Sequence, residues 1–406
     1  VAYKDYICEA VSYNDDALKP GVAYGDPWQL VNAFTGGQVV CEGYSKALRT
    51  CSLTEEIDVT SSEISVNESM VEVIDQENYF KITNPKSYYK YLQKRQLFTI
   101  SEIIDDKTFV VAKHFLKEWS QTDEHLAKFT LQDVIGLMTD TEFKGGMYEN
   151  VQAGEVIREI MEDYGYDKYT VDDNVSDMII SGHIPICSHR EALQQVAFAC
   201  MAVVDTTKDD FVKIYRPTYE SVGLITKDRK LMSNTHQTTQ EDLVTGVMVV
   251  SHSFLLEEEK QIYKKILSEG NHTITFNRPC ADISVVGATV IEGNCNYVVV
   301  NVVSEGEVIM YGKEYLDLTN EHHYTELDDL PTATDEKLLT VDSAELVSET
   351  NVLDVAKNLY YISQYRLNHV FKAVTVDESV GKMYSLATGN NYSPCLITKM
   401  TTDLTG

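Results

Sequence analysis

The clearest pattern of hydrophobic and polar positions in this chain runs from His183 to Tyr215. Ser188 and Glu191 have the spacing of a capping box, in which each side chain hydrogen-bonds to a free backbone N–H at a helix start. The apolar positions that follow recur at helical spacing and form one face, namely Leu193, Val196, Ala197 and Cys200. Short apolar runs flank this helix. The pattern predicts a strand, a capped helix and a second strand, which is a packing unit without catalytic machinery.

The residues just before this unit continue the same organisation. Asn150–Tyr164 has an apolar helical face, and Gly165 is placed to end that helix. Tyr169–Val171 and Met178–Ile180 are predicted to be short strands around an acidic turn. Together these elements predict one α+β module over residues 150–216, closed by Pro217.

From Asp242 to Leu318 the pattern is that of β-structure throughout. The turns Glu292–Asn294 and Ser304–Glu307 separate short runs of β-branched and aromatic residues. The predicted strands are Val247–Val250, Thr273–Phe276, Ile283–Ile291, Tyr297–Val303 and Val308–Tyr311. Short strands at this spacing indicate a small barrel or sandwich. The polar stretch Thr319–Lys337, which contains Pro331, is predicted to be a linker or surface loop.

The two ends of the chain add smaller elements. Near the start, Asp26 and Pro27 are suited to begin a short helix that reaches Phe34. The next predicted elements are a strand-like Met70–Ile74, a hairpin of Leu97–Ile104 with Phe109–Ala112, and an apolar segment Phe129–Met138. Near the end, the predicted elements are a helix over Val352–Ser363 and strands near Val370–Val376, Lys382–Leu386 and Cys395–Thr401.

The predicted fold class is α+β and β-rich, a multidomain chain of small β-barrel-like domains and α+β modules. A chain of 406 residues is too long for one ordinary core, and two to four domains is a reasonable expectation. We predict an N-terminal β-rich domain (1–149), the α+β module (150–216), a β-barrel-like domain (217–330) and a C-terminal α+β domain (331–406).

Composition and charge narrow the possible partners. The chain is 43% hydrophobic and 10% aromatic, which indicates folded domains. Its net charge of -29 repels nucleic acid and anionic membranes, and an acidic wall would keep DNA from sticking if the chain lined a channel. No run of about 18 apolar residues occurs, so a membrane span is not expected. Val1 is not a methionine, and no signal peptide is visible.

The chain shows no recognisable metal or catalytic motif. Its 8 cysteines lack CxxC spacing and are expected to be reduced thiols that act as small hydrophobes, which favours folding in the cytosol. The motifs GxGxxG, GxxxxGK[ST], HExxH and GxSxG are absent. His183, Cys187 and His189 resemble a metal cluster, but no second ligand pair follows at zinc spacing. We therefore expect no catalytic, cofactor-binding or metal-binding residues and no cofactor, and we do not expect an enzyme.

Two other clusters allow more than one interpretation. Asp172, Asp173, Asn174 and Asp177 have nearly the carboxylate density of a calcium loop but lack the Gly and Glu of an EF-hand, so a solvated turn is favoured. The stretch Tyr79–Arg95 mixes basic and aromatic residues, as single-stranded nucleic-acid sites do. The acidic balance of the whole chain favours a subunit interface or a solvated face there.

Several packing patterns resemble a known family. They are FTLQDVIGLM (129–138), FKGGMY (143–148), the stretch ISGHIPICSHREALQQVAFACMAVVDTTKDDFVKIY (180–215), YYISQYRLNHVFKAV (360–374) and ITKMTTDLTG (397–406). Over residues 129–406 the chain is similar to baseplate or tail hub proteins of phages, prophages and phage-tail-like bacteriocins (tailocins) of Gram-positive bacteria. The first 100 or so residues depart from that pattern.

The resemblance implies a role in assembly. It implies a homotrimeric ring at the end of the tail tube, with barrel-like domains that continue the tube. The implied partners are the tail tube or distal tail protein, a spike or tip protein, and a tape-measure protein in the channel. The implied location is a virion or tail-like particle assembled in the bacterial cytoplasm. Two alternatives stay open, a tail-associated cell-wall hydrolase and a receptor- or glycan-binding tail-tip protein.

Overall fold

The computed structural model describes residues 50–404, except 76–77, 82, 105–106, 124, 232–235, 328–335 and 376. The helix expected at Asp26–Phe34 lies outside these residues. The described chain is rich in strands and contains few helices, so the α+β, β-rich fold class is confirmed. The division into four domains stays a prediction.

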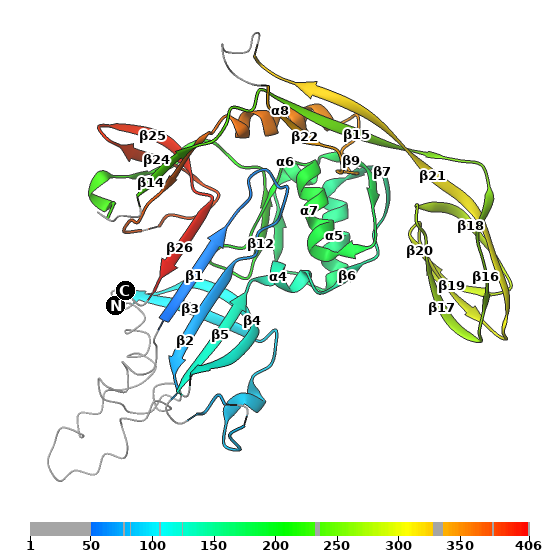
Figure 1. The fold of residues 1–406 in the computed structure, drawn as a ribbon, viewed down its shortest axis with the longest axis horizontal. Coiled ribbons are helices and arrows are strands. Elements are labelled where there is room, and N and C mark those ends of the chain that lie inside the picture. The colour runs from blue at the N-terminus through cyan, green and yellow to red at the C-terminus, as the bar shows by residue number, and fades with distance from the viewer. Residues whose placement is uncertain are drawn as a thin grey trace.

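A six-stranded antiparallel sheet forms the lower left of the molecule in Figure 1. Its order is β26-β1-β2-β5-β4-β3, so the last strand of the chain pairs with the first described one. The strands are β1 (Thr50–Glu56), β2 (Glu68–Ile74), β3 (Leu97–Ile104), β4 (Lys107–Asp123), β5 (Leu126–Gln132) and β26 (Lys399–Asp403). Buried and less buried side chains alternate along β1, which gives the sheet one apolar face. The predicted hairpin is confirmed, and its second strand runs well past Ala112.

The α+β module lies beside this sheet, at the centre of Figure 1. Helices α5 (Ala153–Tyr164) and α7 (His189–Ala199) pack together through buried residues that include Ile157, Ile160 and Leu193. Gly165 ends α5 in the left-handed conformation, as predicted. The other elements are α4 (Val134–Met138), β6 (Glu142–Phe143), β7 (Gly146–Gln152), β8 (Tyr169–Val171), α6 (Asp173–Ser176), β9 (Ile179–Ile184), β10 (Cys187–Ser188), β11 (Val203–Asp205) and β12 (Val212–Tyr215).

The capping box is present as predicted, since Ser188 and Glu191 each bond to the other's backbone N–H. The start of α5 differs from the prediction. Val151 and Gln152 pair with β9 instead of joining the helix, so α5 begins at Ala153. Strand pairing therefore outweighs the helical spacing of Val151.

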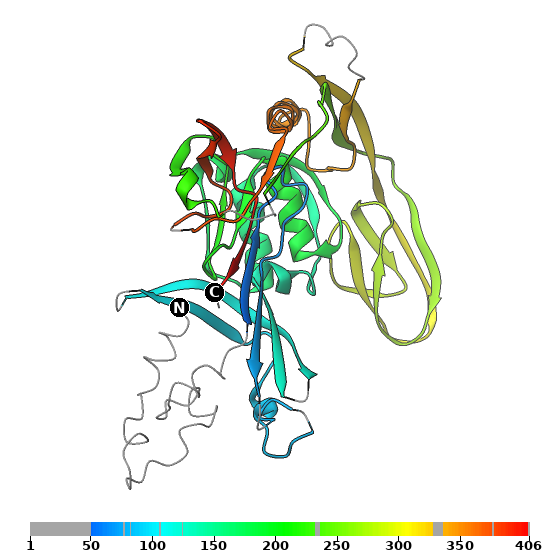
Figure 2. The same ribbon diagram turned by 60° about the vertical axis from the view of Figure 1, so that its left-hand side comes forward.

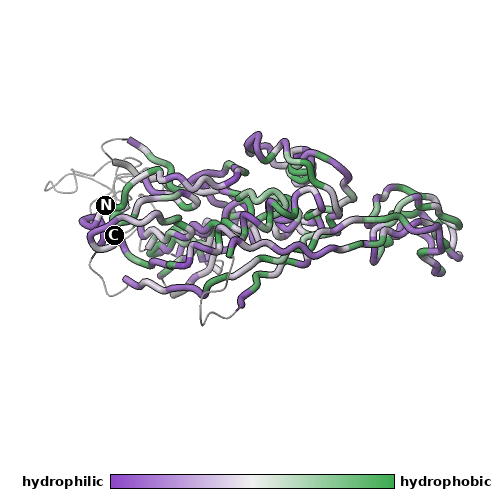
Figure 3. The backbone as a smooth tube through the Cα atoms, turned by 90° about the horizontal axis from the view of Figure 1, so that it is seen from above, coloured by the Kyte–Doolittle hydropathy of each residue, from purple (hydrophilic) through white to green (hydrophobic). Residues whose placement is uncertain are grey.

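A long β-ribbon carries a small β-sandwich away from the module, at the right of Figures 1 and 3. The ribbon pairs β15 (Gly246–Leu256) with the far half of β21 (Gly306–Tyr324). The sandwich adds β16 (Lys260–Leu267), β17 (Gly270–Thr275), β18 (Cys280–Val286), β19 (Thr289–Gly293) and β20 (Tyr297–Val302). Its core is aliphatic and includes Val300, Val302 and Met310. We call the ribbon and the sandwich together the arm.

Two predictions in this region are corrected. Thr319–Lys337 is not wholly a linker, because β21 continues to Tyr324 against Val247 of β15. Ile283–Ile291 is two strands rather than one, because Gly287 turns the chain with a φ of 91° between β18 and β19.

The remaining elements lie at the top and upper left of Figure 1, and Figure 2 shows them from another side. Helix α8 (Val352–Ser363) has the predicted bounds and buries Val355 and Leu359 against β15. Around it are β13 (Ser221–Ile225), β14 (Gln237–Gln240), β22 (Leu338–Val341), β23 (Leu367–Val370), β24 (Met383–Thr388) and β25 (Asn391–Leu396). β13 pairs with β24 and β14 pairs with β23, so residues before and after the arm share these sheets.

Candidate functional site

The structure does not bring the His183, Cys187 and His189 side chains together around one point. His183 Nδ1 lies 2.6 Å from Glu345, and its Nε2 lies 2.7 Å from Asn296. His189 instead contacts Thr141 at 3.0 Å and Asp163 at 2.9 Å. Within the described part of the chain, no three His, Cys, Asp or Glu side chains are grouped as metal ligands.

His183 is held as an imidazolium by an acceptor on each side. The Asn296 Nδ2 atom donates to the backbone oxygens of Lys144 and Ile184, each at 2.9 Å, so its Oδ1 must face His183 as an acceptor. The Glu345 carboxylate accepts at the other nitrogen. Burial lowers the pKa of His183, but its hydrogen bonds with Cys295, Glu345 and Asn296 outweigh burial and raise that pKa to about 9.

These contacts join three parts of the fold. His183 lies on β9 of the module, Asn296 precedes β20 of the arm, and Glu345 lies in the segment before α8. Two glycines leave room for this contact. A Cβ at Gly145 would lie 2.8 Å from Asn296 Nδ2, and one at Gly182 would lie 1.9 Å from the Glu345 oxygen. We call this contact the arm junction.

A hydroxyl, an imidazole and a carboxylate also meet near the arm junction. Ser251 Oγ lies 3.0 Å from His322 Nε2 and 2.8 Å from Glu349 Oε1, and that same oxygen lies 3.3 Å from His322 Nε2. A nucleophilic triad needs the carboxylate at the other ring nitrogen, where it orients the base. Here the carboxylate competes for the serine proton, so the geometry is that of a structural network.

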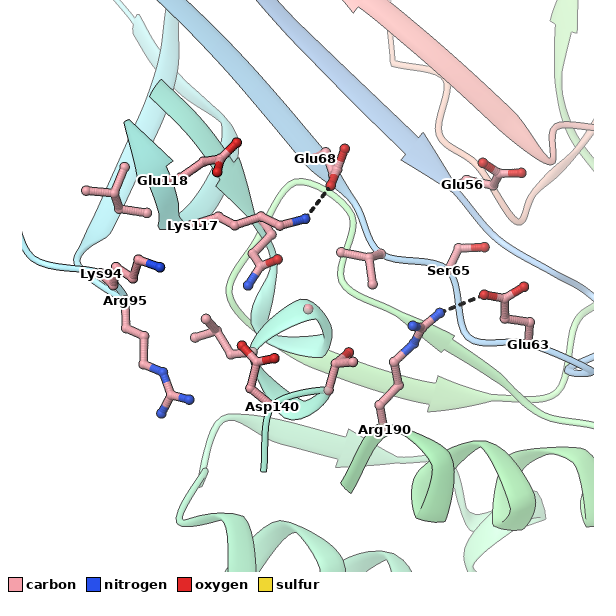
Figure 4. Close-up of a pocket in the computed structure, with 16 residues that line it drawn as sticks. Glu56, Glu63, Ser65, Glu68, Lys94, Arg95, Lys117, Glu118, Asp140 and Arg190 are labelled. Carbon is pink, nitrogen blue, oxygen red and sulfur yellow. Dashed lines mark hydrogen bonds and ion pairs between the residues drawn. The ribbon is translucent and has the colours of Figure 1, made fainter. Parts of the chain in front are cut away.

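A cavity of about 650 Å³ lies between the six-stranded sheet, α4 and the start of α7 (Figure 4). Charged side chains of both signs line it. Lys117 pairs with Glu68 at 3.2 Å, and Arg190 pairs with Glu63 at 2.9 Å and with a backbone oxygen. Neither His nor Cys is among the described residues that line the cavity. The Arg190 contacts link the start of α7 to the segment between β1 and β2, whereas the Lys117–Glu68 pair joins two strands of the sheet.

The other two clusters singled out in the sequence are the acidic turn and the basic and aromatic stretch. Asp172, Asp173, Asn174 and Asp177 are exposed around the short helix α6. In the basic and aromatic stretch, Tyr79 stacks on Tyr88 with centroids 5.3 Å apart, and Tyr91 is 63% exposed. The structure places Lys94 and Arg95, at the end of this stretch, in the lining of the cavity (Figure 4).

The fold of the chain is similar to that of a solved protein, although no family model matches its sequence. No curated protein matches it either. The crystal structure of the tail protein from Neisseria meningitidis MC58 matches with a TM-score of 0.52 at 9% identity, over 88% of each chain. The chain shares that fold.

Two further solved structures are similar at lower scores. They are the 43 kDa tail protein of prophage MuSo2 from Shewanella oneidensis (TM-score 0.47, 9% identity, 88% of this chain and 90% of that one) and prophage tail protein gp18 from Listeria monocytogenes EGD-e (0.45, 8%, 87% and 90%). Among the helices of the described residues, none has the length and apolar character needed to cross a membrane.

Sequence reasoning missed the residues that form the arm junction. Asn296 and Glu345 lie 113 and 162 residues from His183, and no spacing rule connects such positions. One weak signal was available. Asn294 ends the predicted turn Glu292–Asn294, and Asn296 follows two residues later; asparagine side chains at turns commonly bond to backbone.

Proposed function

We propose that this chain is a structural subunit of a phage-type tail, a hub that joins the tail tube to the spike or tip complex. The observation that carries the proposal is the fold shared with a tail protein over 88% of both chains. The packing patterns over residues 129–406, which resemble tail hub proteins, support the same role.

An incomplete sheet gives independent physical support for assembly. Among the described residues, β14 and β23 form a sheet of two strands, and Leu367 and Val370 of β23 are 59% and 56% exposed. Every β14 side chain is exposed as well. A lone strand pair of this kind is marginally stable in water and needs a third strand or a packed face. In the proposed assembly, a neighbouring subunit would supply the third strand or the packed face.

The proposed assembly is a homotrimeric ring, built in the bacterial cytoplasm as part of a virion or a tail-like particle. Its proposed neighbours are the tail tube or distal tail protein on one side and the spike or tip protein on the other. A tape-measure protein or DNA would pass through the channel. The net charge of -29 suits a channel wall that must not hold DNA.

Mass measurement in solution tests the proposal. The purified chain would be studied by native mass spectrometry, alone and with the tube and spike proteins of the same particle. We expect three copies in a ring, and images of the particle should place that ring at the end of the tube. A chain that stays strictly monomeric with both partners present would contradict the hub role. Hydrolysis of purified cell wall would instead favour the enzyme alternative.

A further inference from the structure

The turn between β11 and β12, residues 205–210, lies on the six-stranded sheet and is held there by polar contacts. The backbone N–H of Lys208 donates to Glu55 Oε1 of β1 over 3.1 Å. The hydroxyl of Thr206 donates to Asp133, just after β5, over 2.6 Å. Glu55 and Asp133 are each only 1% exposed. The sheet and the module therefore meet across two buried carboxyl groups. We call this contact the sheet–turn interface.

The two buried carboxyl groups differ in the number of hydrogen bonds that they accept. Asp133 has three donors, which are the backbone N–H groups of Asn67 and Gly136 and the hydroxyl of Thr206. Glu55 has the single donor from Lys208, and its Oε2 is buried with no hydrogen-bond partner among the described residues. An ionised carboxylate in that position loses its hydration without full replacement, whereas a protonated carboxyl group loses much less.

The charges that face Glu55 do not neutralise it. The ammonium of Lys208 donates to the backbone oxygen of Glu378 at 3.0 Å, and the Glu378 carboxylate is bound by Arg229. The other nearby charge is the carboxylate of Asp205, which is itself buried. Burial raises the pKa of Glu55 to about 7, with a further rise from Asp205 and an opposing effect of Lys208.

Asp210, at the end of the turn nearer β12, is held in place by two lysine side chains. Asp210 accepts hydrogen bonds from Lys113 of β4 at 2.9 Å and from Lys168 at 2.5 Å. Burial raises the pKa of Asp210, but these two ammonium groups outweigh burial and hold it well below its usual range. Asp210 is therefore ionised across the physiological range. Burial also raises the pKa of Asp133, to about 6, against its hydrogen bonds from Thr206, Asn67 and Gly136. Glu55 has the higher pKa and an oxygen unpaired among the described residues, so its ionisation disturbs this interface most near neutral pH.

We propose that Glu55 makes the sheet–turn interface a pH-sensitive latch, closed when the carboxyl group carries a proton and loosened when the proton is lost. The device acts between the six-stranded sheet and the α+β module, because the 205–210 turn belongs to the module and Glu55 to the sheet. Loosening would let the two parts shift while Asp210 keeps them tethered through Lys113. Binding or release of a proton by Glu55 is the only event that the latch requires.

The direction of the pH dependence follows from the two protonation states. Glu55 has an ordinary pKa of 4.5 when exposed and about 7 when buried in the interface. The closed state is therefore undisturbed below about pH 4.5, loses stability as the pH rises to about 7, and changes little above that. Opening of the latch should increase at least about tenfold between pH 5 and pH 8.

The experiment compares the full-length wild type with Glu55→Gln and Glu56→Gln. Glutamine keeps the acceptor for the Lys208 N–H and cannot ionise. Glu56 is the adjacent residue, with a side chain 43% exposed and paired with Lys399, so its substitution is a matched control. Hydrogen exchange of the 205–210 amides would be followed by mass spectrometry at pH 5, 6, 7 and 8. At each pH, the exchange rate of the wild type is divided by that of the variant, which cancels the intrinsic pH dependence of exchange.

We expect the exchange of wild type relative to Glu55→Gln to rise by about tenfold or more from pH 5 to pH 8. Glu56→Gln should follow the wild type at every pH. A constant ratio between wild type and Glu55→Gln would overturn the latch, and so would an equal effect of Glu56→Gln. The measurement needs only the isolated chain, so its outcome is independent of the hub role.

Discussion

The arm junction allows a specific prediction, because the single side chain of Asn296 makes several of its hydrogen bonds. Asn296→Ala removes two donations from Nδ2, to the Lys144 and Ile184 oxygens, and the acceptor that faces the His183 imidazolium. Asn296 is 5% exposed, so water does not readily replace these bonds. The substitution leaves a charged N–H and a buried carbonyl without partners.

The magnitude follows from those bonds. A neutral hydrogen bond contributes about 1 kcal/mol, and one to a charged group contributes about 1.5–3 kcal/mol. Two of the first kind and one of the second give a loss of about 3.5–5 kcal/mol at the arm junction. Opening of the arm from the module should therefore increase by roughly 300- to 4000-fold, because about 1.4 kcal/mol corresponds to a factor of ten. The aliphatic core of the arm itself is untouched.

Hydrogen exchange of peptides from residues 143–148 and 293–298 would measure this opening. Asn301→Ala is the matched control, since it removes one exposed bond of 2.7 Å to Asn271 within the same sandwich. A surface change of that kind usually costs less than about 0.5 kcal/mol. The reasoning would be refuted if Asn296→Ala opened the arm no more than Asn301→Ala does.

Three further outcomes are expected. Ser188→Ala should lower the free energy of unfolding of the module by about 1 kcal/mol in urea titrations, because the α7 cap is lost. Gly182→Ala should lower the melting temperature strongly, because its φ is 147° and the new Cβ would meet the Glu345 oxygen at 1.9 Å. The stabilisation from His183 is complete below pH 6.5 and is lost as the pH rises through about 9, so the stability gap between wild type and His183→Gln should shrink over that range. His323→Gln, an exposed control, should leave such a gap unchanged with pH.

Some elements could be predicted closely because their determinants are local. The bounds of α8 and the capping box of α7 depend on residues three or four positions apart, which lie on the same helical turn. The predicted hairpin of β3 and β4 likewise pairs neighbouring segments of the chain. Both partners of each such contact lie close together in the sequence, so the sequence pattern alone predicts them.

Other elements could not be predicted because their partners are distant. The last third of β21 is polar, and it is a strand because β15 pairs with it from residue 247 onward. Val151 fits a helix by its spacing but becomes a strand residue opposite Ile180. In both places a hydrogen-bonding partner from another part of the chain decides the backbone conformation.

The sequence by itself determined the α+β, β-rich class, the bounds of α8, the capping box of α7, and the acidic charge of the chain. Only the tertiary structure decided what the polar residues do. It placed His183 between Glu345 and Asn296, and it buried Glu55 under the 205–210 turn with one oxygen unpaired among the described residues. The physical reason is burial, because a charge or hydrogen bond gains its energetic weight from the loss of water, and burial depends on which distant segments pack together.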